Sequence, residues 1–220
     1  MELDSLPSFF FWAALWVCCL VIPPGSTEIV SSYRLNFLHG LISSVVAVCC
    51  MFDLVGDRFA TMCTISYFCV DFLNILLNDF YFHAKSYQTP SGRKAEYFHH
   101  IFCFSSALYC ELHWKQYCSL DKNPFVLFML AELSTPFLIA WRYYPTNLMG
   151  AIFAVVFFAV RIVYHGCYLI PEYMRRCDAY RAFMVFALLY NGMNAFFMVM
   201  IVGKLVKKMR GKTLMEEKLA

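Results

Sequence analysis

Long apolar runs separated by short polar breaks dominate this chain of 220 residues. Seven of these runs approach the ~20 apolar residues, or about 30 Å of helix, that cross a bilayer. The pattern therefore predicts an all-α polytopic transmembrane helix bundle of about seven spans. The predicted spans are roughly Leu6–Ile22, Phe37–Phe52, Phe59–Phe82, Phe98–Trp114, Pro124–Trp141, Leu148–Ile170 and Phe183–Val206.

Proline, glycine and charged residues mark the predicted ends of these spans. We expect Pro23, Pro24 and Gly25 to stop the first span and Pro171 to end the sixth. The longest predicted loop is Lys85–Lys94, and shorter turns lie at Leu120–Pro124 and Tyr144–Thr146.

Composition agrees with a chain that lies mostly in lipid, because hydrophobic residues make up 61% of it and charged residues only 15%. A soluble domain carries roughly a quarter charged residues. The 11 cysteines form no CxxC pair and no zinc spacing, and most lie inside apolar runs, so we predict neither a disulfide framework nor a metal centre.

Lysine and arginine placement predicts the orientation. Glu2 and Asp4 precede the first apolar run and no Lys or Arg comes before Arg34, which favours a retained helix over a cleaved secretory signal. With an odd number of spans, eleven positive charges share a side with the C-terminus and six lie on the other, so we expect an outside or luminal N-terminus and a cytosolic C-terminus. The charges on the C-terminal side are Arg34, Lys85, Arg93, Lys94, Arg142, Lys204, Lys207, Lys208, Arg210, Lys212 and Lys218. No nucleic-acid-binding domain accompanies this basic tail, so we expect no nucleic acid as a partner.

The fourth run carries the best candidate for chemistry, the adjacent pair His99 and His100. Intramembrane ionisable groups are costly unless they are solvated, paired or used. At helical spacing His99 shares a stripe with Cys103, Ser106, Cys110 and His113, whereas His100 points about 100° away. One imidazole could act as a base or nucleophile held by the other or by a carboxylate; the alternative is an interfacial pair that anchors a helix end. Adjacent histidines lack the i, i+4 spacing of helical zinc ligands.

Further polar groups lie in the other runs. Asp71 in the third run should face the interior and find a partner, either for function or as hydrogen-bonding glue. Pro136 removes a backbone donor and should loosen the turn before it, so the fifth run with Glu132, Ser134 and Thr135 predicts either a cavity wall or an architectural bend.

The sixth run places Arg161, Tyr164, His165 and Tyr168 at spacings that form one polar face on an ordinary α-helix. The guanidinium of Arg161 requires an anion, which could be Asp71, Glu132 or a bound phosphate. Asn191 and Asn194 in the seventh run are candidates for packing between helices, and Asn191 is also a candidate substrate contact.

Several strings together resemble the TLC domain, which ceramide synthases and translocating-chain-associating membrane proteins share. The resemblance is closest to the small TLC-domain-containing proteins, and it covers roughly residues 34–208. The matching residues are Arg34, Asn36, His39 and Gly40, the string Ser66–Asp71, the pair His99 and His100, and the string Glu132–Phe137.

This resemblance implies a bundle in endoplasmic-reticulum-type membranes with a six-helix core and a lipid-accessible cavity. It divides the chain into an N-terminal transmembrane helix and loop (1–33), the TLC domain (34–208) and a basic cytosolic tail (209–220). In ceramide synthases the paired histidines transfer an acyl group from acyl-CoA to a sphingoid amine, and His99 and His100 match that pair. Where the synthases carry an Asp-rich stretch, this chain has Glu132, Ser134 and Thr135.

The sequence thus predicts a membrane protein of lipid homeostasis that acts as an acyl-CoA-dependent acyltransferase on a membrane lipid. The catalytic candidates are His99, His100, Asp71 and Glu132; the substrate-binding candidates are Ser134, Thr135, Arg161, His165 and Asn191. We expect no bound cofactor, acyl-CoA as co-substrate, membrane lipids as partners and a homodimer as the candidate assembly. The alternative is a non-catalytic module, either a lipid-composition regulator or a trafficking receptor.

Overall fold

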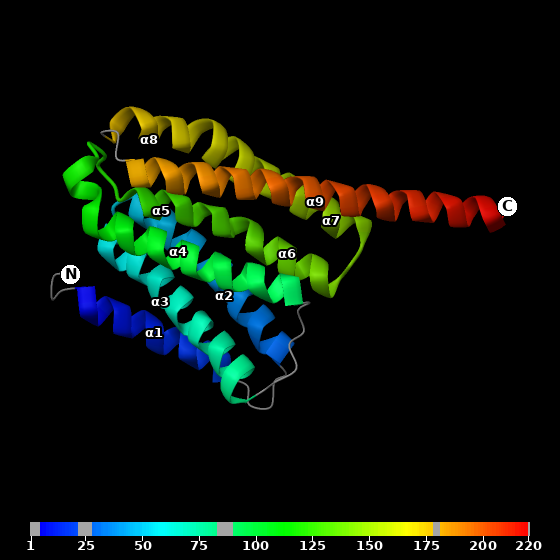
Figure 1. Cartoon of the computed structure of the whole chain (residues 1–220), viewed down its shortest axis with the longest axis horizontal. Coiled ribbons are helices and arrows are strands. Elements are labelled where there is room, and N and C mark those ends of the chain that lie inside the picture. Colours follow the sequence, from blue (N-terminus) through cyan, green and yellow to red (C-terminus); the bar gives the residue numbers. More distant parts are fainter. Residues whose placement is uncertain (1–4, 22–27, 83–89, 178–180, 220) are drawn as a thin grey trace.

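The computed structural model describes residues 5–21, 28–82, 90–177 and 181–219, and this part of the chain is helical with no strand (Figure 1). Successive segments run in alternate directions and pack side by side. The elements are α1 (Ser5–Val21), α2 (Glu28–Met51), α3 (Asp57–Leu76), η1 (Leu77–Tyr81), α4 (Pro90–Tyr117), α5 (Pro124–Phe128), η2 (Met129–Leu133), α6 (Ser134–Tyr143), α7 (Asn147–Phe157), η3 (Phe158–Leu169), α8 (Ile170–Arg176) and α9 (Arg181–Leu219).

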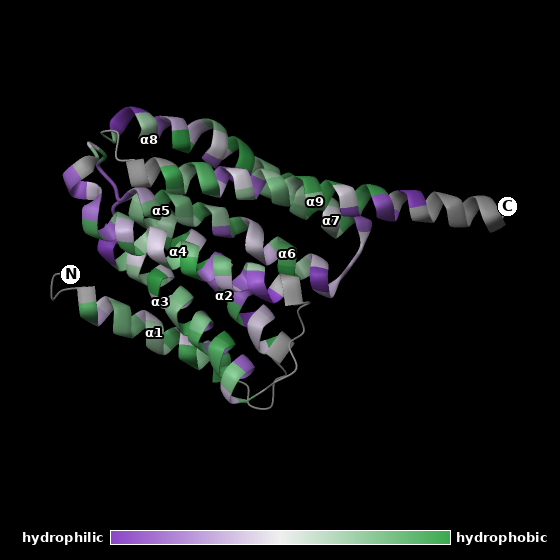
Figure 2. Ribbon diagram, viewed as in Figure 1, coloured by the Kyte–Doolittle hydropathy of each residue, from purple (hydrophilic) through white to green (hydrophobic). Residues whose placement is uncertain are grey.

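Among the described residues, five helical stretches are long and apolar enough to cross a membrane, as expected of an integral membrane protein. They are Val30–Met51, Asp57–Tyr81, Pro124–Tyr143, Asn147–Arg176 and Val185–Lys208. The helix α1 is apolar but shorter, and α4 carries polar side chains along much of its length (Figure 2). The all-α prediction is therefore confirmed, whereas a total of seven spans stays a prediction.

The turns at residues 119–123 and 144–146 lie where the sequence places them, but other predicted ends differ. The predicted loop is too long, because α4 already begins at Pro90; residues 83–89 and the predicted stop at Pro23–Gly25 lie outside the described residues. Pro171 does not end the sixth helix, because η3 runs directly into α8 and the helix continues to Arg176. The helix α9 continues without a break past residue 208.

The first helix is an integral part of the packing. The indole N–H groups of Trp12 and Trp16 donate to the backbone oxygens of Phe59 and Cys63 on α3, at 3.1 and 3.0 Å. Arg34 on α2 donates to the backbone oxygens of Cys19 and Leu20, which satisfies carbonyls at the C-terminal end of α1. These bonds fix α1 against both α2 and α3.

A disulfide bond and a layer of polar side chains connect the helices at the end of the bundle where α1 and α3 begin. A disulfide joins Cys118, just after α4, to Cys177, just after α8. The argument against a disulfide framework missed this bond, because residues 118 and 177 are far apart in sequence and belong to no spacing pattern.

Beside the disulfide lies a polar layer formed by Asp57, Thr61, Glu111 and Asn123, which we call the end layer. The fully buried Asn123 donates from its side chain to Thr61 (3.2 Å) and Glu111 (2.8 Å), and its backbone N–H donates to Asp57 (3.0 Å). The layer thus links α3, α4 and the start of α5.

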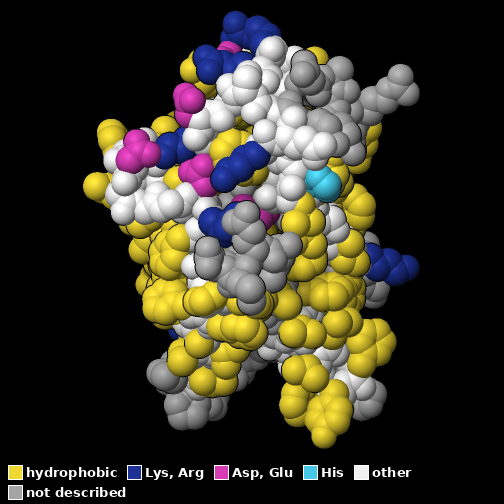
Figure 3. Space-filling view, turned by 90° about the vertical axis from the view of Figure 1, so that its left-hand side faces the viewer, with side chains coloured by type: hydrophobic (Ala, Val, Ile, Leu, Met, Phe, Trp, Pro, Cys, Tyr) yellow, Lys and Arg dark blue, Asp and Glu magenta, His cyan; other side chains and the backbone are white. Residues whose placement is uncertain are grey.

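Charged side chains gather over one area of this end face (Figure 3). Among them Lys122 donates to Asp53, and this hydrogen bond raises the pKa of Lys122. The end layer therefore lies behind a surface rich in paired charges.

The disulfide should stabilise the bundle, because it closes a loop across 59 residues. We expect Cys118→Ser/Cys177→Ser to lower the free energy of unfolding by about 2–4 kcal/mol. Thermal unfolding of the purified protein in detergent measures this change. The matched control is Cys18→Ser/Cys167→Ser, which removes two exposed free thiols and should leave the transition unchanged. Equal melting of both double variants would contradict the expectation.

Candidate functional site

A cavity of about 50 Å³ lies between α3, α4, α5–η2, η3 and α9. One end carries polar side chains and the remainder is mainly apolar and aromatic. The lining consists of Thr64, Phe68, His99, Phe102, Cys103, Ser106, Cys110, Phe125, Phe128, Met129, Ala131, Glu132, Arg161, Phe186, Ala187 and Tyr190.

The helical stripe predicted on the fourth run forms one wall of this cavity. His99, Cys103, Ser106 and Cys110 all line it, as a 3.6-residue repeat requires. His113, the last residue of the predicted stripe, does not line the cavity and packs against Tyr109, with ring centroids 4.8 Å apart.

The two adjacent histidines have different surroundings. The ring of His100 is buried, with Nε2 2.8 Å from Oδ2 of Asp71 and Nδ1 2.9 Å from the backbone oxygen of Glu96. Since a carbonyl oxygen can only accept, Nδ1 of His100 carries a proton. His99 instead faces the cavity, where its Nδ1 lies 3.6 Å from Sγ of Cys103. Of the two rings, that of His99 therefore borders the cavity, and that of His100 is held by Asp71.

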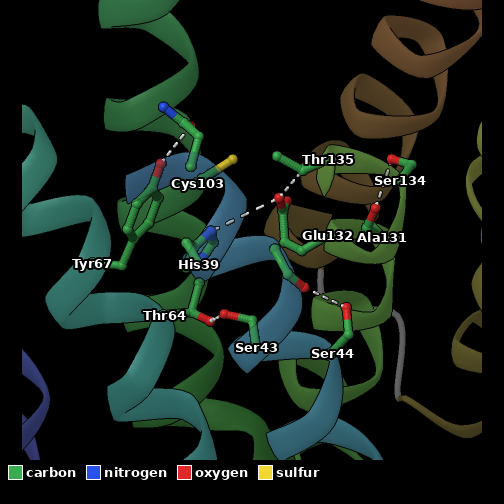
Figure 4. A network of polar contacts seen from close by, with 12 residues as sticks. His39, Ser43, Ser44, Thr64, Tyr67, Cys103, Ala131, Glu132, Ser134 and Thr135 are labelled. Atoms are coloured by element: carbon green, nitrogen blue, oxygen red, sulfur yellow. Dashed lines mark hydrogen bonds and ion pairs between the residues drawn. The ribbon is translucent and has the colours of Figure 1, made fainter. Parts of the chain in front are cut away.

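Asp71 also belongs to a polar chain that leads across to α2. The hydroxyl of Tyr67 lies 3.2 Å from Asp71 and 2.8 Å from Oδ1 of Asn36. The ring of His39 stacks on that of Tyr67 with centroids 3.4 Å apart and an angle of 8°. Figure 4 shows Glu132 pointing toward His39, whose Nδ1 lies 3.9 Å from the carboxylate.

Glu132 pairs with a buried arginine on η3. The guanidinium of Arg161 lies 3.4 Å from Glu132 and also donates to Ser134 Oγ at 2.9 Å and to the backbone oxygen of Ala131 at 3.2 Å. A further bond of 3.4 Å reaches Asn194. Of the anions that the sequence offered to Arg161, the structure brings Glu132 to it. Thr135 completes the arrangement by donating to Glu132 at 2.8 Å.

The position of Glu132 follows from a change of helix type. Pro136 supplies no backbone donor, and the segment before it, η2, is a 3₁₀ helix, which is wound more tightly than an α-helix. Gly40 on α2 lets this segment approach closely. A Cβ atom on Gly40 would lie 2.6 Å from Pro136 Cδ and 2.8 Å from the backbone oxygen of Glu132.

The predicted polar face of the sixth run is wrong in part. The segment η3 is a π-helix, so its buried positions are Arg161, His165 and Leu169, at intervals of four. Tyr168 is 63% exposed. The α-helical spacing used on the sequence therefore placed Tyr168 on the wrong face.

The remaining substrate-binding candidates lie outside the cavity lining. His165 is buried, stacks on Phe128 at 5.5 Å and bonds the backbone oxygen of Val160. Ser134 and Thr135 hold Arg161 and Glu132. Asn191 lies against Gly166 of η3, where its Oδ1 would be 2.8 Å from an added Cβ.

Sequence reasoning missed three residues of the site: His39, Tyr67 and Asn194. Both His39 and Tyr67 lie in strings that carried the family resemblance, and the glycine after His39 marked a close helix contact. Asn194 was interpreted only as packing. Within the described part of the chain, no group of three His, Cys, Asp or Glu side chains is placed to hold a metal ion.

Comparison with known proteins adds no relative: no family model, no curated protein and no solved structure matches this chain.

The ion pair between Arg161 and Glu132 should be important for folding, because removing one partner leaves an uncompensated buried charge. We expect Arg161→Met to lower the free energy of unfolding by about 3–5 kcal/mol, and Glu132→Gln/Arg161→Met to restore part of that loss. Unfolding in mixed micelles measures both. The control Arg175→Met removes an exposed partner of Glu172 and should change little. A double variant no more stable than Arg161→Met would contradict the argument.

Proposed function

We propose that this protein is a multi-pass membrane protein of the endoplasmic reticulum that takes part in lipid homeostasis by transferring an acyl group from acyl-CoA to a membrane lipid. The observation that carries the proposal is the cavity in which His99 stands at the border between a polar end and an apolar remainder. The resemblance to the TLC domain supports the same activity.

In the proposed reaction His99 is the general base. It takes the proton from the hydroxyl or amine of the lipid acceptor while that oxygen or nitrogen attacks the thioester carbonyl. The carbon–sulfur bond breaks, the coenzyme A thiolate leaves, and it receives the proton from His99. The products are the acylated lipid and free coenzyme A.

His100 and Asp71 act as positioning residues in this proposal. Both ring nitrogens of His100 already have partners, so its ring is held fixed beside that of His99, with the two centroids 5.7 Å apart. Glu132 and Arg161 contribute fixed charge at the polar end of the cavity. Because these charges are already in position before the reaction, they stabilise the negative charge that develops on the thioester oxygen without any rearrangement.

The proposed orientation places the C-terminus in the cytosol and the disulfide end in the lumen. Two independent observations support it. More lysines and arginines share the C-terminal side, and disulfides such as Cys118–Cys177 persist in oxidising compartments. The amino-terminal half of α4, which carries His99, then faces the cytosol, where acyl-CoA is found.

Turnover by the purified protein tests the reaction. With labelled palmitoyl-CoA and membrane-lipid acceptors, we expect His99→Ala to lower the rate of product formation by about 10²–10⁴-fold, and Asp71→Asn by a smaller factor. The control is His113→Ala on the same helix, outside the cavity lining, which should retain activity. If the wild type forms no product, and the variants alter only stability or partner capture, the protein is a non-catalytic lipid regulator or trafficking receptor.

Labelling of single exposed cysteines tests the orientation. In sealed microsomes a membrane-impermeant maleimide should modify Tyr144→Cys directly and Asp121→Cys only after the membrane is permeabilised. Both positions are exposed and lie in turns at opposite ends of the bundle. The reverse order of labelling would show the opposite orientation.

A further inference from the structure

The cavity has a direction, which its lining residues on α4 and α3 define. On α4 its lining runs from His99 through Cys103 and Ser106 to Cys110. The antiparallel α3 contributes Phe68 beside His99, at 5.9 Å between ring centroids, and then Thr64 one turn further on. The long axis of the cavity therefore follows the bundle, away from His99 and toward the disulfide end.

Beyond His99 the wall offers little hydrogen bonding to a ligand. The hydroxyl of Ser106 donates to the backbone oxygen of Phe102 at 2.7 Å, and the hydroxyl of Thr64 lies 3.4 Å from that of Ser43. The other walls of this part are aromatic or aliphatic side chains, among them Phe125 and Phe128. The hydroxyl of Tyr190, which also lines the cavity, is buried and has no hydrogen-bond partner among the described residues. An apolar chain suits the part lined by Ser106 and Thr64, because both of these hydroxyls already have partners.

The far end of the cavity meets the end layer. Its last lining residues are Thr64, Cys110 and Phe125. The next residues belong to the hydrogen-bonded layer: Thr61 one turn before Thr64, Glu111 directly after Cys110, and Asn123. Extending the cavity would break buried hydrogen bonds and leave their donors unpaired, which is unfavourable. The end layer is thus a fixed floor.

The depth of the cavity can be compared with a lipid leaflet. Eleven residues separate His99 from Cys110, which is about 16 Å along an α-helix. The hydrocarbon core of a bilayer is about 30 Å thick, so one leaflet measures about 15 Å. The two lengths agree.

We infer that Cys110, together with Thr64 and Phe125, sets the length of the acyl chain that the protein accepts. The inference rests on the proposed function and names its substrate class: single acyl chains of ordinary membrane length, with the carboxyl end at His99 and the methyl end at Cys110. Very long chains are excluded by the end layer. Cys110 is a specificity-determining residue and takes no part in the chemistry.

Competition binding tests this inference without turnover. Purified protein in nanodiscs binds radiolabelled palmitoyl-CoA, and unlabelled lauroyl-CoA, palmitoyl-CoA and lignoceroyl-CoA compete with it. For the wild type we expect lignoceroyl-CoA to compete at least about tenfold less well than palmitoyl-CoA. A tenfold difference in affinity corresponds to about 1.4 kcal/mol, and a chain too long for the cavity loses at least this much because its excess methylenes are not buried. Cys110→Phe fills the far end, so lauroyl-CoA should become the best competitor.

Two further variants keep the test decisive. Cys167→Phe makes the same change at an exposed thiol and should retain the wild-type order. If Cys110→Phe does not fold, Cys110→Val adds less volume and should shift the order in the same direction by a smaller factor. An unchanged order in a folded Cys110 variant overturns the inference. Length-selective binding without turnover would instead refute the acyltransferase and leave the chain-length assignment intact.

Discussion

The ion pair between Glu132 and Arg161 is the constraint around which the interior is arranged. Neither charge is tolerated alone inside an apolar bundle, so the surrounding helices supply the remaining partners. Ser134, Thr135 and Asn194 bond this pair, and His39 brings α2 beside the carboxylate. The 3₁₀ segment and Gly40 provide the close approach that the pair needs. The polar end of the cavity exists because this cluster occupies the centre of the bundle.

The helical segments could be predicted from the sequence because hydropathy and proline carry the physics of membrane insertion. Their internal geometry could not. A π-helix and a 3₁₀ helix have periods other than the 3.6 residues of an α-helix, so α-helical spacing assigned Tyr168 to a buried face. Pro171 was assigned to a helix end because proline usually interrupts a helix. The pairing of Cys118 with Cys177 depends on how two distant helix ends meet, and periodicity contains no information on that.

The candidate site was predictable to the extent that it depends on single helices. The stripe from His99 to Cys110 follows from α-helical spacing alone, and the cavity wall on it agrees. Contacts between helices could not be decided from the sequence, where Asp71 and Glu132 were both candidate partners of Arg161. The packing of the helices decides between them: Glu132 pairs with Arg161, and Asp71 pairs with His100. His39 and Tyr67 went unassigned because an aromatic stack has no signature along one chain.

The π-helical segment of the sixth helix, η3, affects which faces the residues after it present. A π-helical turn contains more residues than an α-helical turn, so the positions that follow it are rotated about the helix axis. Deleting one residue would return the segment to α-helical register and rotate everything after it by about 100°. Tyr173 would then lose its bond to the backbone oxygen of Pro124. The π-helical segment thus lets the same helix bury Arg161 and His165 and still direct Tyr173 toward α5.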